Sequence, residues 1–253
     1  MTYRFSVDGR IACVTGASSG LGRFLAGVLA EAGAAVVGIA RRKSELESWA
    51  DGVRAAGGRA AIVQADLSDP TSLDEVAGKA ERHFGAPDIL INAAGINPRR
   101  HADDLTPETW RHTLDLNLST PFFLSQKLVP AMAEKGWGRI INVASLQSQR
   151  AFANGLAYGA SKGGIAQLTR AMAEAWSARG IMCNALAPGF FPTELTGPVF
   201  SDTKLSEHVA AQTCIGRNGR LEDIAGPALF LASPASDYVT GQVLAVDGGF
   251  TAK

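Results

Sequence analysis

Short apolar runs alternate along this chain with longer segments in which apolar residues recur at helical spacing. Each run is apolar at successive positions, which indicates strands that are buried on both faces. The apolar runs predict seven strands, at residues 11–14, 35–39, 60–63, 88–91, 139–143, 181–186 and 242–246. The segments between them follow the 3.6-residue period of helices. They predict helices through 24–32, at 43–56, from 69 onward, and at 106–134, 157–178 and 221–232.

Local signals refine these helices. Pro70, preceded by Asp69 as a cap, is typical of a helix start. The long segment 106–134 contains Pro121, so we expect that helix to be kinked or interrupted there. Residues 188–220 predict a loop with short helices, and we expect this loop to bind the substrate.

The alternation of strands and helices predicts an α/β fold. Helical connections between buried strands imply right-handed crossovers and a parallel, doubly wound sheet with helices on both faces. Nothing in the chain has the composition of a linker, so we expect a single domain over residues 1–253. Such sheets bind ligands beyond the carboxyl ends of their strands. The segments that follow each strand are therefore the ones to search for a site.

Composition excludes several classes of protein. The chain has 24 basic and 24 acidic residues, so it lacks the positive charge of a dedicated nucleic-acid binder. No apolar run approaches the roughly 18 residues needed to span a bilayer, and the first eight residues lack the pattern of a signal peptide. We expect a cytoplasmic protein with neither nucleic acid nor membrane as partner. Cys13, Cys183 and Cys214 are expected to be small buried residues, because their spacing fits neither a zinc site nor a disulfide framework.

Glycine is in excess, with 28 residues in 253, and several glycines follow the first strand. Residues 15–22 read Thr-Gly-Ala-Ser-Ser-Gly-Leu-Gly and lead into a helix. Glycines let the backbone approach a pyrophosphate, and the helix N-terminus then supplies N–H groups to it. A glycine-rich turn without a ligand is the alternative. We predict a dinucleotide site with Gly16, Ser18, Ser19, Gly20, Leu21 and Gly22 as contacts.

The second strand is followed by Arg41 and Arg42, where a carboxylate would be expected for the ribose hydroxyls of NAD(H). Arginine pairs bidentately with phosphate. The pair therefore predicts a preference for NADP(H), with its 2′-phosphate, over NAD(H), which is kept as the alternative cofactor. Solvated arginines at a turn remain a second interpretation.

The segments after the third and fourth strands contain further candidate cofactor contacts. Asp66 and Leu67 follow the third strand and are placed to meet an adenine ring, unless Asp66 only forms a turn. Asn92, Ala93 and Gly95 follow the fourth strand and suit close approach of a cofactor. Small residues at a crowded strand end explain this last segment equally well.

The fifth strand is followed by Ser145, and thirteen residues later come Tyr158 and Lys162. Four-residue spacing places Tyr158 and Lys162 on one face of a helix. A neighbouring ammonium lowers the pKa of a phenol, and such a pair can act as general acid and base on a hydroxyl or carbonyl. No Gly-x-Ser-x-Gly sequence surrounds Ser145, which excludes a lipase-type nucleophile. The four histidines have no clear metal-ligand spacing, so no metal site is predicted.

These motifs, in this order, resemble the short-chain dehydrogenases/reductases over essentially the full chain. They are the Gly16-Gly20-Gly22 turn, residues 92–95, Ser145, Tyr158-x-x-x-Lys162, and Pro188-Gly189 with Thr193. The resemblance implies a single-domain Rossmann fold, with strand order 3-2-1-4-5-6-7 in the seven-stranded sheet. It also implies an NADP(H)- or NAD(H)-dependent ketoreductase and a homotetramer. Ala93 departs from the usual Asn-Asn-Ala-Gly motif.

The resemblance also implies a catalytic tetrad of Asn117, Ser145, Tyr158 and Lys162. In that tetrad Tyr158 transfers the substrate proton, and Lys162 lowers its pKa and holds the nicotinamide ribose. Ser145 binds the substrate oxygen, and Asn117 keeps a water that links Lys162 to solvent. By the same resemblance, the nicotinamide end would meet Pro188, Gly189, Phe191 and Thr193.

The substrate is less closely defined by the sequence. The part of the chain from Ala187 onward resembles family members that act on keto sugar acids, such as gluconate 5-dehydrogenases. Arg99 could hold a substrate carboxylate, with a solvated loop arginine as the alternative, and Gln147 and Phe190 lie near the expected mouth. A 3-ketoacyl thioester or a hydrophobic ketone is the alternative substrate. A nucleotide-binding regulator without catalysis is the alternative class, although no tetrad member is missing.

Overall fold

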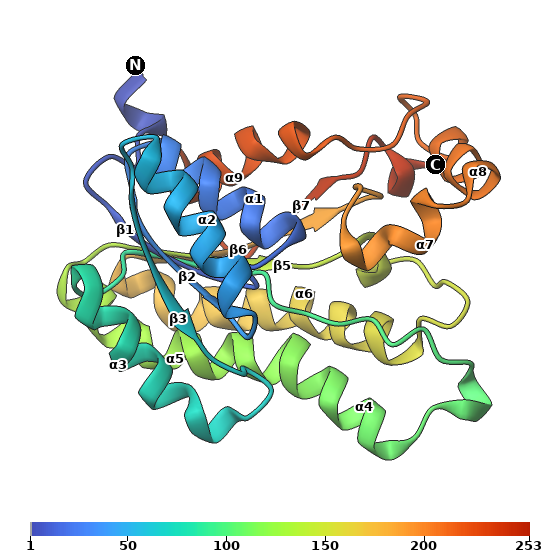
Figure 1. The fold of residues 1–253 in the computed structure, drawn as a ribbon, viewed down its shortest axis with the longest axis horizontal. Coiled ribbons are helices and arrows are strands. Elements are labelled where there is room, and N and C mark those ends of the chain that lie inside the picture. Colours follow the sequence, from blue (N-terminus) through green and yellow to red (C-terminus); the bar gives the residue numbers. More distant parts are fainter. Residues whose placement is uncertain (1) are drawn as a thin grey trace.

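The computed structural model describes residues 2–253 and contains one seven-stranded sheet flanked by two layers of helices (Figure 1). All strand pairs are parallel, and the order is β3-β2-β1-β4-β5-β6-β7. The predicted fold and strand order are confirmed. The strands are β1 (Ile11–Thr15), β2 (Ala35–Ala40), β3 (Arg59–Gln64), β4 (Ile89–Asn92), β5 (Gly138–Val143), β6 (Ile181–Pro188) and β7 (Val243–Val246).

Two apolar cores hold the helices against the sheet, because successive strand residues point to opposite faces. Val14 of β1 lies in one core with α1 (Gly20–Glu31), α2 (Lys43–Ala55) and α9 (Ala225–Ala232). Its neighbour Cys13 lies in the other core. That core includes α3 (Leu73–Phe84), α5 (Thr120–Glu134) and α6 (Leu156–Trp176). Burial on both faces explains why most of the strands are apolar at successive positions. The prediction of burial on both faces is wrong for β7, because this strand lies at the edge of the sheet with Leu244 and Ala245 exposed.

The interruption expected in the segment 106–134 is present. Helix α4 (Pro107–Leu114) is followed by a π-helical turn at Asp115–Ser119, and α5 then begins at Thr120. Pro121 has no N–H to donate to the carbonyl of Asn117 four residues earlier, so a regular α-helix cannot continue through this point. The Asp69 side chain caps the segment at Pro70 as predicted, but its first turn, Pro70–Ser72, is a 3-10 turn.

The segment 188–220 contains α7 (Gly197–Phe200) and α8 (Thr203–Ala211). These helices lie together with the C-terminus at one end of the sheet (Figure 1). None of the helices between residues 2 and 253 has the length and apolar character that crossing a bilayer requires. The cysteine prediction is confirmed for Cys13 and Cys183, which are buried. It is wrong for Cys214, which lies exposed against the Gly249 carbonyl.

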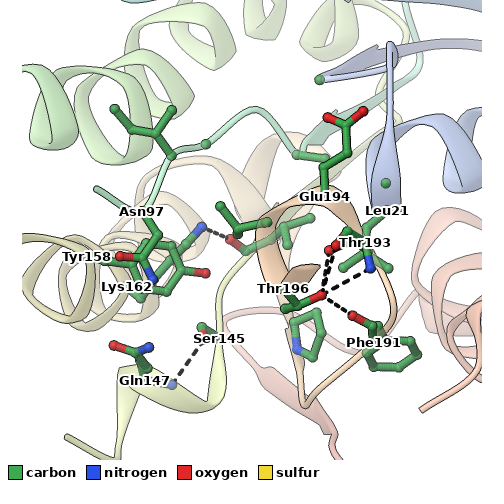
Figure 2. Close-up of a pocket in the computed structure, with 18 of the residues that line it drawn as sticks. Leu21, Asn97, Ser145, Gln147, Tyr158, Lys162, Phe191, Thr193, Glu194 and Thr196 are labelled. Carbon is green, nitrogen blue, oxygen red and sulfur yellow. Dashed lines mark hydrogen bonds between the residues drawn. The ribbon is translucent and has the colours of Figure 1, made fainter. Parts of the chain in front are cut away.

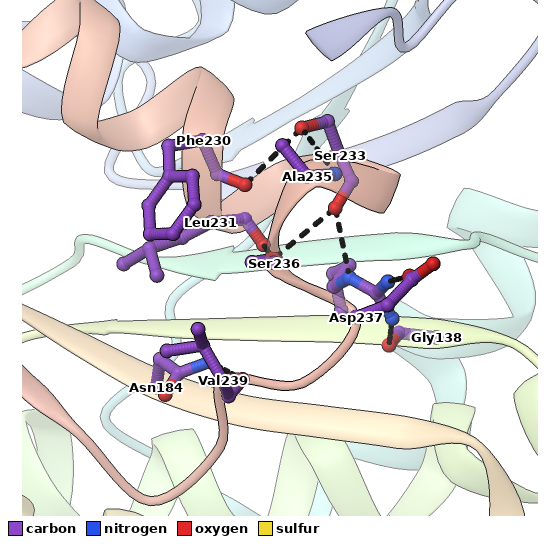
Figure 3. Close-up of polar contacts among 10 residues, drawn as sticks. Gly138, Asn184, Phe230, Leu231, Ser233, Ala235, Ser236, Asp237 and Val239 are labelled. Atoms are coloured by element: carbon purple, nitrogen blue, oxygen red, sulfur yellow. Dashed lines mark hydrogen bonds and ion pairs between the residues drawn. The ribbon is translucent and has the colours of Figure 1, made fainter. Parts of the chain in front are cut away.

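A buried arginine ties the start of β5 to the turn that precedes β7. The Arg139 side chain is 1% exposed and donates to the carbonyls of Gly138 and Ser233 at 2.8 and 3.3 Å, and to the carboxylate of Asp237. Its guanidinium also stacks on the Trp137 ring, 4.3 Å from the centroid. Ser233 and Ser236 bond within the same turn (Figure 3). The carbonyls and the single carboxylate together satisfy a charge that would otherwise be costly to bury.

Candidate active site

A cavity of about 1030 Å³ opens at the carboxyl ends of the strands. Residues that follow β1 to β6 line it, as expected for a doubly wound sheet. Figure 2 shows Tyr158, Lys162 and Asn97 at one end of this cavity and Glu194, Thr193 and Leu21 at the other. Nearly all the sequence-predicted site residues lie in its wall.

The glycine turn after β1 packs directly against the end of β4. Gly16 has φ +71°, and a Cβ there would lie 2.9 Å from the carbonyl oxygen of Ala93. Thr15 Oγ1 accepts hydrogen bonds from the N–H groups of Ala93 and Ala94, both at 3.0 Å. The turn therefore needs glycine at position 16 because of the neighbouring strand. Ser19 is the N-cap residue of α1, but its side chain accepts no hydrogen bond from the first N–H groups of the helix. These N–H groups therefore remain available at the cavity.

The arginines that follow β2 differ in their partners. Arg41 Nη1 lies 3.9 Å from Asp66 Oδ2, and both side chains are mostly exposed. Arg42 donates from Nε and Nη2 to Ser18 Oγ at 3.4 and 3.3 Å. It also donates from both terminal nitrogens to the carboxylate of Glu194. Asp66 and Leu67 both line the cavity. The Asp66 carboxylate accepts a hydrogen bond from the Ser68 N–H, and Leu67 is buried.

The residues after β4 divide between the cavity and the core. Ala93 and Gly95 line the cavity. Asn92 is not among the lining residues: its Nδ2 donates to Asn142 Oδ1 at 2.9 Å, within the sheet. The side chain of Asn92 therefore has a structural role at the crowded end of β4. Gly95 lies next to the Asn117 side chain, and a Cβ there would be 3.1 Å from Asn117 Oδ1.

Ser145, Tyr158 and Lys162 all line the cavity. Ser145 follows β5, and its Oγ accepts from the N–H of Gln147 at 3.1 Å (Figure 2). Tyr158 and Lys162 lie one turn apart on α6, and Lys162 Nζ is 5.5 Å from the centroid of the phenol ring. Lys162 Nζ donates to the Val143 carbonyl. All three side chains are buried.

The pKa of Tyr158 differs from the expectation. Burial raises the pKa of this phenol, and a hydrogen bond with Ser145 and the nearby charge of Arg99 lower it only in part. Lys162 is not a source of the shift; burial instead lowers the pKa of its own ammonium to about 8. The pKa of Tyr158 is raised overall because desolvation of the phenol is the largest effect, and the role of Lys162 in lowering that pKa stays a prediction.

Asn117 lies in the π-helical turn, a feature that is frequent at functional sites. Its Oδ1 accepts from the Ile96 N–H and its Nδ2 donates to the Ile96 carbonyl, both at 2.9 Å. Its Nδ2 also donates to Ser161 Oγ at 3.0 Å. The side chain is therefore fully used in joining α6 to the segment after β4. Its main-chain carbonyl lacks the usual N–H donor four residues on, where Pro121 stands.

The segment after β6 borders the cavity from Pro188 to Thr196. Thr193 and Thr196 form a reciprocal cap, in which Thr196 Oγ1 accepts from the Thr193 N–H at 3.0 Å and donates to the Phe191 carbonyl (Figure 2). Gly189 also has a structural reason to be glycine, because a Cβ would lie 2.8 Å from Cα of Asp247. Phe191 is buried and lines the cavity.

The three residues assigned to the substrate all line the cavity. Arg99 has φ +49°, which is a strained conformation for a residue with a side chain. Its Nη2 donates to the Leu195 carbonyl at 2.8 Å. Gln147 Oε1 is buried without a hydrogen-bond partner. Phe190 packs on Phe152 and Phe250, with ring centroids 5.9 and 5.7 Å away.

Sequence reasoning missed several residues of the cavity wall, including Asn97, Phe152 and His208. Asn97 lies two residues beyond Gly95, so the rule that sites follow strands could have found it. His208 comes from α8, and nothing in its sequence context marks it. No group of three or more His, Cys, Asp or Glu side chains that could hold a metal occurs within the described part of the chain.

Comparison with known proteins gives consistent matches over the whole chain. A family model described as enoyl-(acyl carrier protein) reductase matches residues 16–251. Gluconate 5-dehydrogenase of Gluconobacter oxydans is 39% identical, covering 98% of this chain and 96% of that protein. The 2-dehydro-3-deoxy-D-gluconate 5-dehydrogenase of Bacillus subtilis is 40% identical, covering 98% and 97%. A crystal structure of a gluconate 5-dehydrogenase from Burkholderia cenocepacia, in complex with NADP and tartrate, is 39% identical, has a TM-score of 0.95, and covers 99% of this chain and 98% of that one.

Proposed function

The chain belongs to the short-chain dehydrogenase/reductase family of NAD(P)-dependent oxidoreductases, and from this premise we propose its reaction. It transfers a hydride between NADP(H) and the carbonyl or secondary alcohol of a keto sugar acid or polyol. The observation that carries the proposal is that Arg99 lines the same cavity as Ser145, Tyr158 and Lys162, where the Leu195 carbonyl holds its side chain. A guanidinium in the same cavity as a proton-transferring phenol suits a substrate that has a carboxylate as well as a hydroxyl.

The cavity residues fit a dinucleotide with a 2′-phosphate. The uncapped N-terminus of α1 presents N–H groups where a pyrophosphate would bind. Arg42 and Ser18 form a donor pair at the end of the cavity nearest β2. Relatives with this fold bind NADP, as in the Burkholderia cenocepacia structure. When bound, the nicotinamide accepts a hydride from the alcohol carbon or returns it to the carbonyl carbon.

Tyr158 transfers the proton that accompanies the hydride. In alcohol oxidation the phenolate oxygen takes the hydroxyl proton as the carbonyl forms, and in reduction the phenol returns it. Ser145, which lines the same cavity as Tyr158, offers its hydroxyl to the same substrate oxygen and stabilises the charge that develops there.

Lys162 and Asn117 support this proton transfer. Lys162, buried next to Tyr158, holds the nicotinamide ribose and passes protons with a pKa that burial lowers to about 8. Asn117 is a positioning residue whose main-chain carbonyl, without its α-helical donor, holds the water that links Lys162 to solvent. These roles agree with the burial and contacts of both side chains.

The substrate end combines one charge with one unpaired acceptor. Arg99 is held by the Leu195 carbonyl and retains N–H groups for a carboxylate. Gln147 Oε1 is buried and unpaired, so it would gain a partner from a substrate hydroxyl. A carboxylate with several hydroxyls, as in a sugar acid, satisfies both groups.

The cluster of Phe152, Phe190 and Phe250 favours a second candidate substrate. Two of these rings line the cavity, and the third packs behind them. An apolar wall in the cavity that Tyr158 also lines suits a hydrophobic ketone or a 3-ketoacyl thioester. Arg99 and Gln147 would recognise a charged, hydroxylated substrate, whereas the phenylalanine rings would recognise an apolar one. Substrates that differ in charge and polarity therefore separate the two candidates.

A substrate panel with purified enzyme tests the proposal. We expect gluconate-type acids to be oxidised faster than neutral polyols of equal length and than apolar cyclic alcohols. Arg99→Gln should lower kcat/KM for the acids by about tenfold to a hundredfold, because a charge-assisted hydrogen bond is lost. The fall for the neutral polyol should be smaller. An equal fall in kcat/KM for both substrates would mean that Arg99 acts on Tyr158 and not on a substrate carboxylate. Activity confined to ketoacyl thioesters would favour the second candidate substrate.

The cofactor preference is a separate expectation. Arg42 should make kcat/KM for the NADP couple about tenfold or more higher than for the NAD couple, because only the former brings a phosphate to the guanidinium. Steady-state rates with both cofactors at saturating substrate measure the ratio. A higher kcat/KM with the NAD couple would contradict the assignment of Arg42.

We retain three coarser expectations in this proposal. The segment 188–220 forms the substrate-binding loop of the single domain. A homotetramer and a cytoplasmic location stay predictions. Light scattering of the purified protein measures the number of subunits.

A further inference from the structure

A carboxylate of the chain itself already binds the arginine assigned to the cofactor phosphate. Arg42 Nη1 donates to Glu194 Oε1 at 3.1 Å, and Nη2 donates to Oε2 at 2.9 Å. The two parallel bonds form the bidentate pair that a guanidinium also makes with phosphate. Arg42 follows β2, while Glu194 lies 152 residues later, in the segment after β6.

The surroundings of this pair resemble an occupied anion site. Ser18 Oγ accepts two further bonds from Arg42, so the guanidinium is held in place on the cavity wall. The pKa of the Glu194 carboxyl is lowered, chiefly by its hydrogen bond from Arg42 and less by the Ser19 hydroxyl. Glu194 is therefore a full negative charge at neutral pH, and it lines the same cavity.

We propose that Glu194 competes with the 2′-phosphate of NADP(H) for Arg42 and thereby sets how strongly the enzyme prefers NADP(H) to NAD(H). The proposal rests on the proposed function, which assigns the 2′-phosphate to Arg42. NADP(H) must displace the carboxylate before its phosphate can pair with the same N–H groups. NAD(H) has no such phosphate, so it leaves the Arg42–Glu194 pair intact and meets no uncompensated charge.

The same exchange affects the substrate segment. Glu194 begins the turn Glu194–Thr196, and the next residue, Leu195, accepts a hydrogen bond from Arg99 at 2.8 Å. This turn is therefore held by Arg42 at the adenosine end of the cavity and by Arg99 at the substrate end. Displacement of Glu194 removes the first of these contacts. NADP(H) should therefore loosen residues 194–196 more than NAD(H) does.

Direct binding measurements test the competition. Kd values for NADPH and NADH are measured by calorimetry with wild type, Glu194→Gln and Glu45→Gln. Glu45 is the matched control, because it also lies near Arg42 but bonds to Ser44 and not to the guanidinium. We expect Glu194→Gln to tighten NADPH binding about two- to fivefold, the range of an exposed ion pair. NADH binding should stay within about twofold, and Glu45→Gln should change the two cofactors much less.

The outcomes separate the competition from the proposed function. Unchanged or weaker NADPH binding by Glu194→Gln, with an unchanged melting temperature, would overturn the competition. An equal effect of Glu45→Gln would also overturn it, because the effect would then be one of net charge. The proposed NADP(H) preference is decided by the wild type alone, where weaker binding of NADPH than of NADH would refute that preference. The competition is decided by the change in NADPH binding that Glu194→Gln causes. Hydrogen exchange of residues 194–196 with each cofactor bound gives a second measurement, in which equal protection contradicts the displacement.

Discussion

Replacing Tyr158 by phenylalanine should lower kcat by about 10²- to 10⁴-fold, the range for removal of a positioned general acid or base. The ring still fills the same buried space next to Ser145 and Lys162, so the fold and the cofactor site should be preserved. Calorimetric Kd for NADPH should therefore stay close to that of wild type. Stopped-flow or steady-state consumption of NADPH measures the loss of turnover.

The pH dependence distinguishes proton transfer from a structural role of Tyr158. Because burial raises the pKa of this phenol, little phenolate is present at neutral pH. Alcohol oxidation needs the phenolate, so its rate in wild type should rise as the pH increases through the alkaline range. Tyr158→Phe should lose this rise along with the rate. A variant with near-normal turnover, or with an unchanged pH profile, would remove Tyr158 from the mechanism.

Arg139→Ala should lower the free energy of unfolding by about 3 kcal/mol or more, through lost packing and unpaired buried groups. The guanidinium is almost fully buried on Trp137 and bonds to the Gly138 and Ser233 carbonyls. Its removal takes a side-chain donor from the Gly138 carbonyl, leaves the Ser233 carbonyl with its bonds from Ser236, and detaches the turn before β7 from β5. Urea denaturation at a single protein concentration measures the change.

Arg59→Ala is the matched control for this effect. Arg59 is also near the start of a strand, but its side chain lies exposed at the edge of the sheet. Its removal should cost within about 0.5 kcal/mol. Arg139 lies at the opposite end of β5 from Ser145, so kcat of Arg139→Ala measured well below its melting temperature should match wild type. Equal stabilities of the two variants would show that the buried arginine contributes nothing beyond a surface residue.

The arrangement of strands and most of the cavity wall could be predicted from the sequence. A parallel sheet brings the carboxyl ends of its strands to one edge, so short segments after Val14, Ala40, Val63 and Val143 had to meet there. The spacing of Tyr158 and Lys162 on one helix is likewise a local property. Asn92 stays a predicted cofactor residue, although the alternation of the strand turns its side chain to Asn142.

Other features depended on residues that are distant in the chain. The raised pKa of Tyr158 follows from the burial of the phenol in the packed structure. The residues that neighbour Tyr158 in the sequence do not predict this burial. Gly189 must be glycine because Asp247 is packed against it. The exposure of Cys214 and the presence of His208 in the cavity wall depend on where α8 and the chain after it lie.

The sequence by itself determined the parallel sheet and the segments that form the cavity, because strand burial, helix period and turn residues act over a few positions. The order of the strands was implied by the resemblance to a known family. Only the tertiary structure decided the partners of the charges in that cavity. Arg42 was recognisable as an anion-binding residue, but its partner Glu194 is brought to it from 152 residues away. Coulomb interactions and desolvation depend on distances in space, so they become defined only when the chain has packed.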